Sequence, residues 1–488
     1  MASEKKITLT PHQEVVFNEL TKFVDSDSRV FILKGYAGTG KTTLMKTFIN
    51  FLRKEEEHFK LLASTGRAAK ILRDITGTLA STVHSELYTF KDFNQDLDKK
   101  LADKDGDMPS VDETGQLLLQ FEVVEVDNSD YARCIYIIDE SSMISDVKDK
   151  NPTQAEFGSG RLLDDLLKHD SKGKFVFVGD ICQLPPINSS LSPALSSLYF
   201  KEIFHVEPKE AELTQIMRQE EGNDIVVAAS VIRDMYNNPP PPNNIGKTQW
   251  VKFPLKGYNN ITICPSEQSL IDRYIDDIKE NGYENATMIC RSNTKCGQMA
   301  RHIRSALGMV YTLHAGDLLI VNQNNYISGL VNGDMVKVIA IGNWEERACL
   351  TFQHVEVEEI GTKRRASQLM IMDILGGYSP NLDQERQKAL FIDYFLRMKK
   401  LGIKQNSPMF KKNMMEDPYL NALRANYGYA VTCHKSQGGE WKNVYLSIPG
   451  NLSCNAGKEE FQWLYTAMTR AKQQLFIQEG FFLSKRSP

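Results

Sequence analysis

The sequence predicts an α/β protein with two parallel-sheet units in tandem, each carrying an insertion. Apolar β-type runs alternate with helix-forming stretches in the first half of the chain, which is the rhythm of a parallel sheet. The glycine-rich segment GYAGTGKT, residues 35–42, follows one such run and precedes a helical pattern. The α/β rhythm stops twice and returns each time, so we expect one insertion in each unit.

Length and composition indicate a multidomain globular protein. The chain has 488 residues, more than the ~100–200 of one ordinary domain. No run approaches the ~20 apolar residues that span a bilayer, and the N-terminus lacks the apolar region of a signal peptide. We therefore expect no membrane contact and a location in the cytoplasm or at the nucleoid; a monomer is expected as well. The net charge of −4 means that any nucleic-acid contact is a local groove.

The first unit is expected to cover residues 1–84 and 131–217. Its predicted strands are residues 30–33, 61–63, 135–138 and 175–178. Residues 85–130 form the first insertion. Residues 91–114 within it are highly charged, which favours a solvated loop, whereas the alternating run 116–126 predicts a strand.

The second unit is expected to cover residues 218–315 and 426–488. The proline-rich tract 237–244 predicts an exposed connection. Expected strands are residues 286–290, 429–432, 444–448 and 474–477. The second insertion, residues 316–425, begins with β-type runs at 318–321, 335–341 and 350–357. It becomes helical from residue 382, and the basic residues there suit a solvated helix face at least as well as a contact with DNA or a partner.

Residues 35–42 have the composition of a phosphate-binding loop. Backbone N–H groups of such a loop surround the phosphates, Lys41 reaches the β and γ oxygens, and the Thr42 hydroxyl is placed to ligate Mg²⁺. The sequence therefore predicts a site for ATP and Mg²⁺. The expected residues of this loop are Gly35, Ala37, Gly38, Thr39, Gly40, Lys41, Thr42 and Thr43.

Two acidic residues at the end of a predicted strand supply the second half of such a site. Asp139 can hold the Mg²⁺ shell, and Glu140 can orient and deprotonate the attacking water. The segment that follows the strand at 175–178 contains Gln183, which can touch the γ-phosphate. The alternative for this segment, a Gly-Asp turn followed by prolines, does not explain Gln183.

Phosphoryl transfer also needs positive charge on the γ-phosphate, which an arginine supplies. Arg218 and Arg470 are the two candidates, although from spacing alone either residue also suits an ordinary surface position. If both point into one cleft, ATP would clamp the two units together.

An ordered set of nine motifs resembles the superfamily-1 helicases, and more narrowly their B-type, RecD-like branch. In chain order the motifs are LTPHQ, the phosphate-binding loop, LLASTGRAAK, STVH, IIDESSM, GDICQLPP, LTQIMRQ, YAVTCHKSQGGEW and LYTAMTRAK. They span about residues 9–478, and the plan of insertions is similar to that of the Dda-type phage helicases. The resemblance implies two RecA-like domains with ATP between them and single-stranded DNA across their tops.

The resemblance also implies roles for individual residues. Gln13 would contact adenine, Glu440 would hold the ribose, and Arg218 and Arg470 would stabilise the transition state. The implied nucleic-acid contacts are Thr65, Gly66, Arg67, Thr82, His84, Asn293, Thr294, Thr432, His434 and Ser436. Short hydroxyl, amide and imidazole groups suit contacts to phosphate and sugar, but each of these segments is also a plausible helix N-cap.

The family places a β-hairpin pin in the first insertion and an SH3-like barrel with a helical extension in the second. Residues 116–126 would supply one arm of the pin, with Phe121 as a wedge that stacks on bases. A Phe121 ring packed on the parent unit is an equal alternative. The acidic stretch 92–113 leaves the position of the pin tip open.

The resemblance therefore implies an ATP- and Mg²⁺-dependent 5′→3′ DNA helicase that acts on single-stranded DNA and on junctions of single-stranded and duplex DNA. Such an enzyme would serve DNA replication, repair or recombination, with proteins of these pathways as partners. Two alternatives stay open: an RNA helicase or translocase of the same superfamily, and a motor subunit of a recombination complex.

Overall fold

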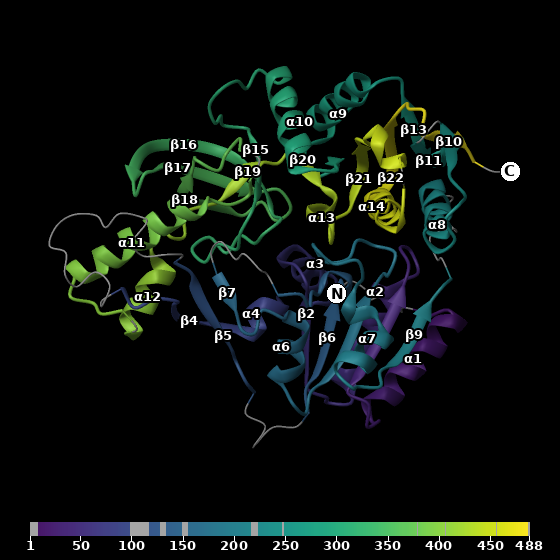
Figure 1. Ribbon diagram of the computed structural model, residues 1–488, viewed down its shortest axis with the longest axis horizontal. Helices are drawn as coiled ribbons and strands as arrows, with labels where there is room; N and C mark the ends of the chain where they lie inside the picture. The colour runs from purple at the N-terminus through teal and green to yellow at the C-terminus, as the bar shows by residue number, and fades with distance from the viewer. Residues whose placement is uncertain are drawn as a thin grey trace, which may run out of the picture.

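The computed structural model is built around two parallel sheets and a five-stranded antiparallel sheet (Figure 1). The described residues are 8–97, 117–126, 133–148, 155–215, 223–245, 248–377, 379–405, 407–454 and 456–486. Among them, no helix combines the length and apolar character needed to cross a membrane.

The first unit contains a six-stranded parallel sheet, in the lower half of Figure 1. Its strands, in spatial order, are β3 (Ala80–Thr82), β2 (Phe59–Ala63), β6 (Ile135–Asp139), β8 (Lys174–Gly179), β1 (Val30–Gly35) and β9 (Lys209–Leu213). The four predicted strands are confirmed. They occupy the middle of the sheet, because apolar runs suit strands that are buried on both faces.

Helices cover both faces of this sheet. One face holds α1 (Pro11–Val24), α2 (Lys41–Lys54) and α3 (Gly66–Thr76), and the other holds α4 (Val83–Leu87), α6 (Leu162–His169) and α7 (Ser197–Ile203). Successive side chains of β1 alternate between the two cores: Leu33 packs in the first, and Ile32 in the second.

The second unit contains a five-stranded parallel sheet, above the first in Figure 1. Its spatial order is β13 (Ile261–Cys264), β22 (Ala471–Gln478), β21 (Trp441–Leu446), β14 (Ala286–Cys290) and β20 (Ala430–Thr432). Its helices are α8 (Asp224–Asn237), α9 (Glu267–Asn281), α10 (Asn293–Ala306), α13 (Cys433–Ser436) and α14 (Lys458–Met468). Residues 238–242 of the tract 237–244 connect α8 to a short strand, β10 (Asn243–Ile245), and are mostly exposed, as predicted.

The described part of the first insertion supplies two strands of a small three-stranded sheet, and residues 155–157 of the first unit supply the third. Strand β4 (Tyr88–Phe93) pairs antiparallel with β5 (Leu119–Val123), and β7 (Ala155–Phe157) adds a parallel strand beside β5. The alternating run 116–126 thus supplies a strand, as predicted. Residues 98–116, which include most of the acidic stretch, lie outside the described residues, and so does the place where the hairpin turns.

The second insertion contains a five-stranded antiparallel sheet. Its order is β18 (Arg365–Ile371), β17 (Leu350–Glu359), β16 (Met335–Arg347), β15 (Leu318–Val321) and β19 (Ala425–Tyr427). The predicted runs become β15, β16 and β17. Strands β18 and β19 were not expected, and β19 joins the sheet only after the helices α11 (Gln384–Lys400) and α12 (Pro408–Glu416). The SH3-like barrel itself stays a prediction.

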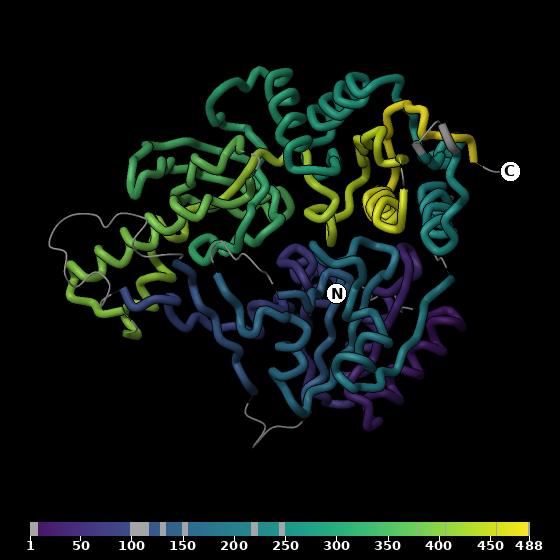
Figure 2. Tube along the Cα trace, in the orientation of Figure 1, coloured from purple at the N-terminus to yellow at the C-terminus, as the bar shows by residue number. Residues whose placement is uncertain are grey.

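The two insertions touch each other, at the left of Figure 2. The Phe93 ring on β4 lies 5.4 Å from Phe391 of α11 and 6.0 Å from Phe410 of α12, between ring centroids. The Gln405 amide, between these helices, donates to Asp92 Oδ1 (3.0 Å) and accepts from the Leu97 N–H (2.9 Å). An apolar cluster and the hydrogen bonds of Gln405, here called the clasp, therefore connect the hairpin to the helical extension.

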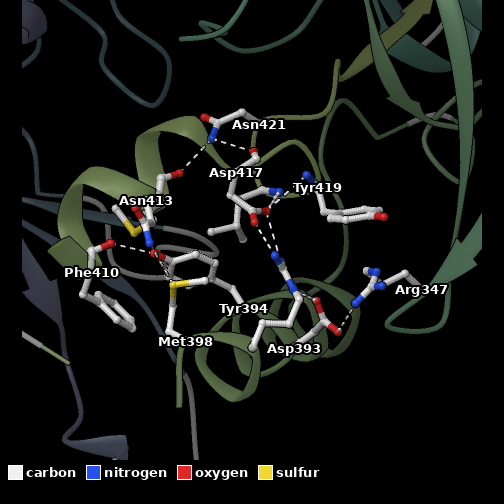
Figure 3. A network of polar contacts seen from close by, with 12 residues as sticks. Arg347, Asp393, Tyr394, Met398, Phe410, Asn413, Asp417, Tyr419 and Asn421 are labelled. Carbon is white, nitrogen blue, oxygen red and sulfur yellow. Dashed lines mark hydrogen bonds and ion pairs between the residues drawn. The ribbon is translucent and has the colours of Figure 1, made fainter. Parts of the chain in front are cut away.

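Figure 3 shows how the helical extension is anchored to the antiparallel sheet. Arg397 of α11 donates to Asp393 Oδ2 (2.8 Å) and forms a two-pronged ion pair with Asp417. Arg347, on β16, donates to the other oxygen of Asp393 (3.1 Å). Arg397 therefore has a structural role, whereas Lys400 on the same helix is exposed.

Candidate nucleotide-binding site

The phosphate-binding loop leaves β1 and enters α2, as its sequence context predicts. Gly38 and Gly40 both have φ +79°, a left-handed conformation that favours glycine. Lys41 Nζ donates to the backbone oxygens of Gly35 (2.6 Å) and Tyr36 (3.1 Å). The ammonium group thus lies against the loop that would hold the phosphates.

The two predicted acids end β6 beside this loop. Glu140 has φ 51° and ψ 40°, an unusual conformation for a residue with a side chain and one that is typical of functional sites. Its N–H donates to Asp139 Oδ1 (2.9 Å). Burial, and then the charge of Glu140, raise the pKa of Asp139 to about 7, against the opposing effect of Lys41. A divalent cation here would relieve the repulsion between the two carboxylates.

The segment after β8 brings Gln183 into the region between the two units. Its side chain is 4% exposed, and Oε1 has no hydrogen-bond donor among the described residues. Asp180 precedes it and is also buried. An unpaired buried acceptor is costly unless a further group, such as a bound water, supplies a donor.

Helix α14 of the second unit contacts this segment directly. The Gln462 amide donates to the backbone oxygens of Ile181 and Gln183, both at 3.1 Å. The Leu184 N–H donates to Thr466 Oγ1 at 2.9 Å. The predicted composite site is therefore closed by protein contacts between the units.

Arg470 follows α14 and is 4% exposed. Its guanidinium donates to Thr466 O (3.0 Å), Thr469 Oγ1 (3.1 Å) and Gly439 O (3.4 Å). Burial raises the pKa of Asp180, and the charges of Lys41 and Arg470 partly oppose this shift. Arg218, the other predicted arginine, lies outside the described residues.

The two residues assigned to the adenosine moiety have other partners as well. Gln13 is buried, caps α1 by accepting from the Thr10 N–H (3.1 Å), and donates to Thr39 O of the phosphate-binding loop (3.2 Å). Glu440 forms an ion pair with Lys472 (3.1 Å). Gln13 therefore adjoins the loop, as an adenine contact would require.

Several predicted nucleic-acid contacts are helix caps, which is the alternative that the sequence left open. The hydroxyl groups of Thr65, Thr82 and Thr432 accept from backbone N–H groups at the starts of α3, α4 and α13. Asn293 and Thr294 are exposed at the start of α10. One pocket is lined by Asn293 and Thr432 together with residues of the second insertion, so the structure brings these two predicted contacts together.

Three predicted contacts have environments that do not suit a nucleic-acid backbone. Ser436 is fully buried, and its hydroxyl donates to Cys433 O (2.7 Å). A Cβ on Gly66 would lie 2.5 Å from Val331 of the second insertion, so this position is closed by packing. The guanidinium of Arg67 lies over the Trp441 ring, between the two units.

The two histidines differ in their surroundings. The His84 ring lies 5.5 Å from Phe157 and 5.7 Å from Tyr88, between centroids, on the side of the small three-stranded sheet. His434, on α13, is half-buried, and burial lowers its pKa. The lowered pKa favours a neutral His434 near pH 7.

Phe121 lies within the aromatic packing of the small sheet. Its ring stacks on Phe157 at 4.7 Å and meets Phe90 edge-on at 5.7 Å, between centroids. This is the packed arrangement that the sequence left as the alternative to a wedge.

The sequence analysis missed Asp180, Tyr465 and Trp441 as individual site residues, although each lies inside a recognised motif. Their partners are hundreds of residues away in the chain, so no local pattern marks them. The one feature of the sequence that could have identified them is that each is a polar or aromatic residue within a motif that forms the site.

Comparison with known proteins gives matches to both units. Residues 8–237 match a family model described as an AAA domain, and residues 427–478 match one described as a UvrD-like helicase C-terminal domain. An uncharacterized protein of Methanocaldococcus jannaschii, MJ1519, is 25% identical over 483 residues, which are 92% of this chain and 36% of the relative. The chain thus spans about a third of that relative's length.

Two further matches are to helicases. The ATP-dependent RecD2 DNA helicase of Deinococcus radiodurans is 29% identical over 202 residues, which are 41% of this chain and 21% of that protein. The crystal structure of the Pif1 helicase from Candida albicans aligns with a TM-score of 0.48 and 15% identity, covering 98% of this chain and 95% of that one.

Proposed function

We propose that the chain is a 5′→3′ DNA helicase of the RecD-like, B-type branch of superfamily 1, which translocates on single-stranded DNA and unwinds duplexes; the matches of residues 8–237 to an AAA domain and of residues 427–478 to a UvrD-like helicase C-terminal domain support this proposal. The family supports ATP-dependent helicase activity. The observation that carries the proposal is the contact between the two units at this site: the Ala37 N–H of the phosphate-binding loop donates to Tyr465 of α14, the Leu184 N–H donates to Thr466 of the same helix, and Arg470 follows that helix.

Residues of the first unit would hold the nucleotide. The exposed Thr42 hydroxyl and Asp139 would ligate Mg²⁺, which neutralises charge on the β- and γ-phosphates. Lys41 would bind the same phosphates, and the loop amides would surround them. The pair of carboxylates at Asp139 and Glu140 fits a site for a divalent cation.

Glu140 and Gln183 would orient the attacking water. Glu140 would accept its proton, and the buried Gln183 Oε1 offers the acceptor for its second hydrogen. Arg470 would supply charge to the γ-phosphate, together with Arg218. Because Arg470 belongs to the second unit, hydrolysis would release the contact that holds the units together and so move the DNA strand.

The track for single-stranded DNA would cross both units. Thr82 and His84 lie on the first unit, and Asn293, Thr294 and Thr432 lie on the second. Uncharged side chains of this kind suit contacts to phosphate and sugar that do not depend on sequence. The hairpin β4–β5, supported by α11 and α12, would lie where the duplex separates.

The test is ATP turnover by the purified full chain with DNA or RNA oligonucleotides of the same sequence. We expect strong stimulation by single-stranded DNA and weak stimulation by RNA. If RNA stimulates ATP turnover and DNA does not, then RNA is the strand on which the protein moves. The side chains named above do not by themselves distinguish the two, because none of them is specific for the 2′-hydroxyl. If the purified protein hydrolyses ATP but unwinds DNA only when a partner protein is added, it is instead a motor subunit.

A further inference from the structure

Tyr465 of α14 connects the second unit to the phosphate-binding loop of the first. Its hydroxyl oxygen accepts a hydrogen bond from the Ala37 N–H at 2.9 Å. The same hydroxyl donates to Asp180 Oδ2 at 2.7 Å. Tyr465 is 2% exposed, so both bonds are shielded from solvent.

The carboxylate of Asp180 extends this connection to Gln183. Its other oxygen, Oδ1, accepts from the Cys182 N–H at 2.9 Å, and the Gln183 N–H donates to Asp180 O at 3.2 Å. The carboxylate therefore fixes the turn that presents Gln183. One phenol group thus joins the phosphate-binding loop to the segment that carries the proposed water-orienting residue.

Neighbouring side chains of α14 hold the same segment. Gln462 lies three positions before Tyr465, and Thr466 lies four positions after Gln462. The spacing i, i+3, i+4 places all three on one face of the helix. The side chains of Gln462 and Thr466 bond backbone groups of residues 181–184, whereas the Tyr465 hydroxyl also reaches Ala37. Tyr465 is thus the member of this face that contacts both halves of the nucleotide site.

The protonation state of the phenol fits this role. Burial, and then the nearby charge of Asp180, raise the pKa of Tyr465 well above its ordinary value. The hydroxyl therefore keeps its proton and acts as a donor to Asp180 and an acceptor from Ala37. Separation of the units breaks both bonds together, so the connection exists only when the cleft is closed.

We propose that Tyr465 is a positioning residue for ATP hydrolysis. Its hydroxyl fixes the position of the phosphate-binding loop relative to the Gln183 segment as the two units close. The inference rests on the proposed ATPase activity. Tyr465 acts through the Ala37 amide and the Asp180 carboxylate, so it should affect the closed, reacting state rather than the initial binding of nucleotide by the first unit.

The test is Tyr465→Phe in the full chain, which keeps the ring and removes the hydroxyl. DNA-stimulated kcat should fall by roughly tenfold or more, while KM for ATP and the Kd of a fluorescent ADP analogue should each change by less than about twofold. Unchanged kcat would overturn the proposal. So would a loss confined to nucleotide affinity.

Tyr445→Phe is the matched control. Tyr445 is also buried in the second unit, and its hydroxyl donates to the carboxylate of Asp277 (2.9 Å), away from the nucleotide site. The Tyr445→Phe substitution should change the thermal stability about as much as Tyr465→Phe does, and it should leave kcat unchanged. Equal losses of kcat in the two variants would mean that a buried tyrosine hydroxyl is merely structural, and would overturn the proposal.

A double-mutant cycle with Asp180→Asn tests the connection itself. If Tyr465 acts through Asp180, then Tyr465→Phe should lower kcat much less in the Asp180→Asn background than in the wild type. Fully additive losses would contradict this route. A wild-type protein without ATPase activity would instead contradict the proposed function, so the two failures are distinguishable.

Discussion

Arg67 of the first unit lies with its guanidinium carbon 4.3 Å from the ring centroid of Trp441 in the second unit. A Cβ on Gly439 would lie 2.6 Å from the same guanidinium carbon, so glycine leaves the room that the arginine uses. Burial, together with the charge of Arg470, lowers the pKa of Arg67 to about 10, against the opposing effect of Asp334. Arg67 is therefore a contact between the units, beside the nucleotide site.

Arg67→Gln should reduce DNA-stimulated ATP turnover and leave the salt dependence of single-stranded DNA binding unchanged. A contact with a DNA phosphate would instead contribute about 0.7 to the slope of log K against log[salt]. Binding titrations between about 50 and 200 mM salt measure this slope. Arg73→Gln, an exposed position on the same helix, is the control and should alter neither property.

Lys41→Ala and Glu140→Gln should each abolish ATP turnover, with at least about a hundredfold loss, because phosphate binding and water activation are both required. Binding of single-stranded DNA without nucleotide should survive in both variants. Removal of Mg²⁺ with a chelator should have the same effect on the wild-type protein. Full turnover by either variant would remove the assignment of the site.

Phe93→Ala should uncouple unwinding from ATP hydrolysis. Phe93 is 3% exposed in the cluster that joins the hairpin to α11 and α12, and loss of such a ring costs about 3–5 kcal/mol. The hairpin should therefore lose its support, while the ATP site stays intact. Stopped-flow unwinding beside steady-state ATPase measures the two separately, with the exposed Phe481→Ala as the control. Parallel losses of both activities would speak against this role for the hairpin.

Glu86→Gln should remove part of the dependence of stability on pH. His169 and Lys60 beside the carboxylate lower the pKa of Glu86 to about 2, below its ordinary value. The stabilisation is therefore fully present above about pH 4.5 and lost as the pH falls towards 2. With solvent screening included, it amounts to roughly 1–2 kcal/mol. Thermal midpoints at about pH 6 and pH 3 should differ more for the wild type than for the variant, and equal differences would contradict the prediction.

The sequence predicted those parts of the fold that depend on local pattern. The apolar runs that became β1, β2, β6 and β8 are buried on both faces and so leave a continuous apolar signature. Strand β19 has three residues and pairs with β15 across a long excursion of the chain, so its position depends on register rather than on local preference.

The site shows the same division. The phosphate-binding loop and the acids at the end of β6 are recognisable because their chemistry requires fixed residue types at fixed spacing. The clasp at Gln405, the stack of Arg67 on Trp441 and the hydroxyl of Tyr465 are contacts between segments far apart in the chain. A helix cap and a DNA contact also use the same hydroxyl groups, so sequence alone did not separate them at Thr65 or Thr432.

If the closed composite site drives movement along single-stranded DNA from 5′ to 3′, unwinding should depend on the polarity of the single-stranded tail. The most direct measurement compares two partial duplexes with the same paired region, one with a 5′ single-stranded tail and the other with a 3′ tail. Strand separation is followed with ATP and Mg²⁺ in the presence of a trap strand. Unwinding of the 5′-tailed substrate, absent with Lys41→Ala, is the predicted result. Preference for the 3′-tailed substrate would contradict the account.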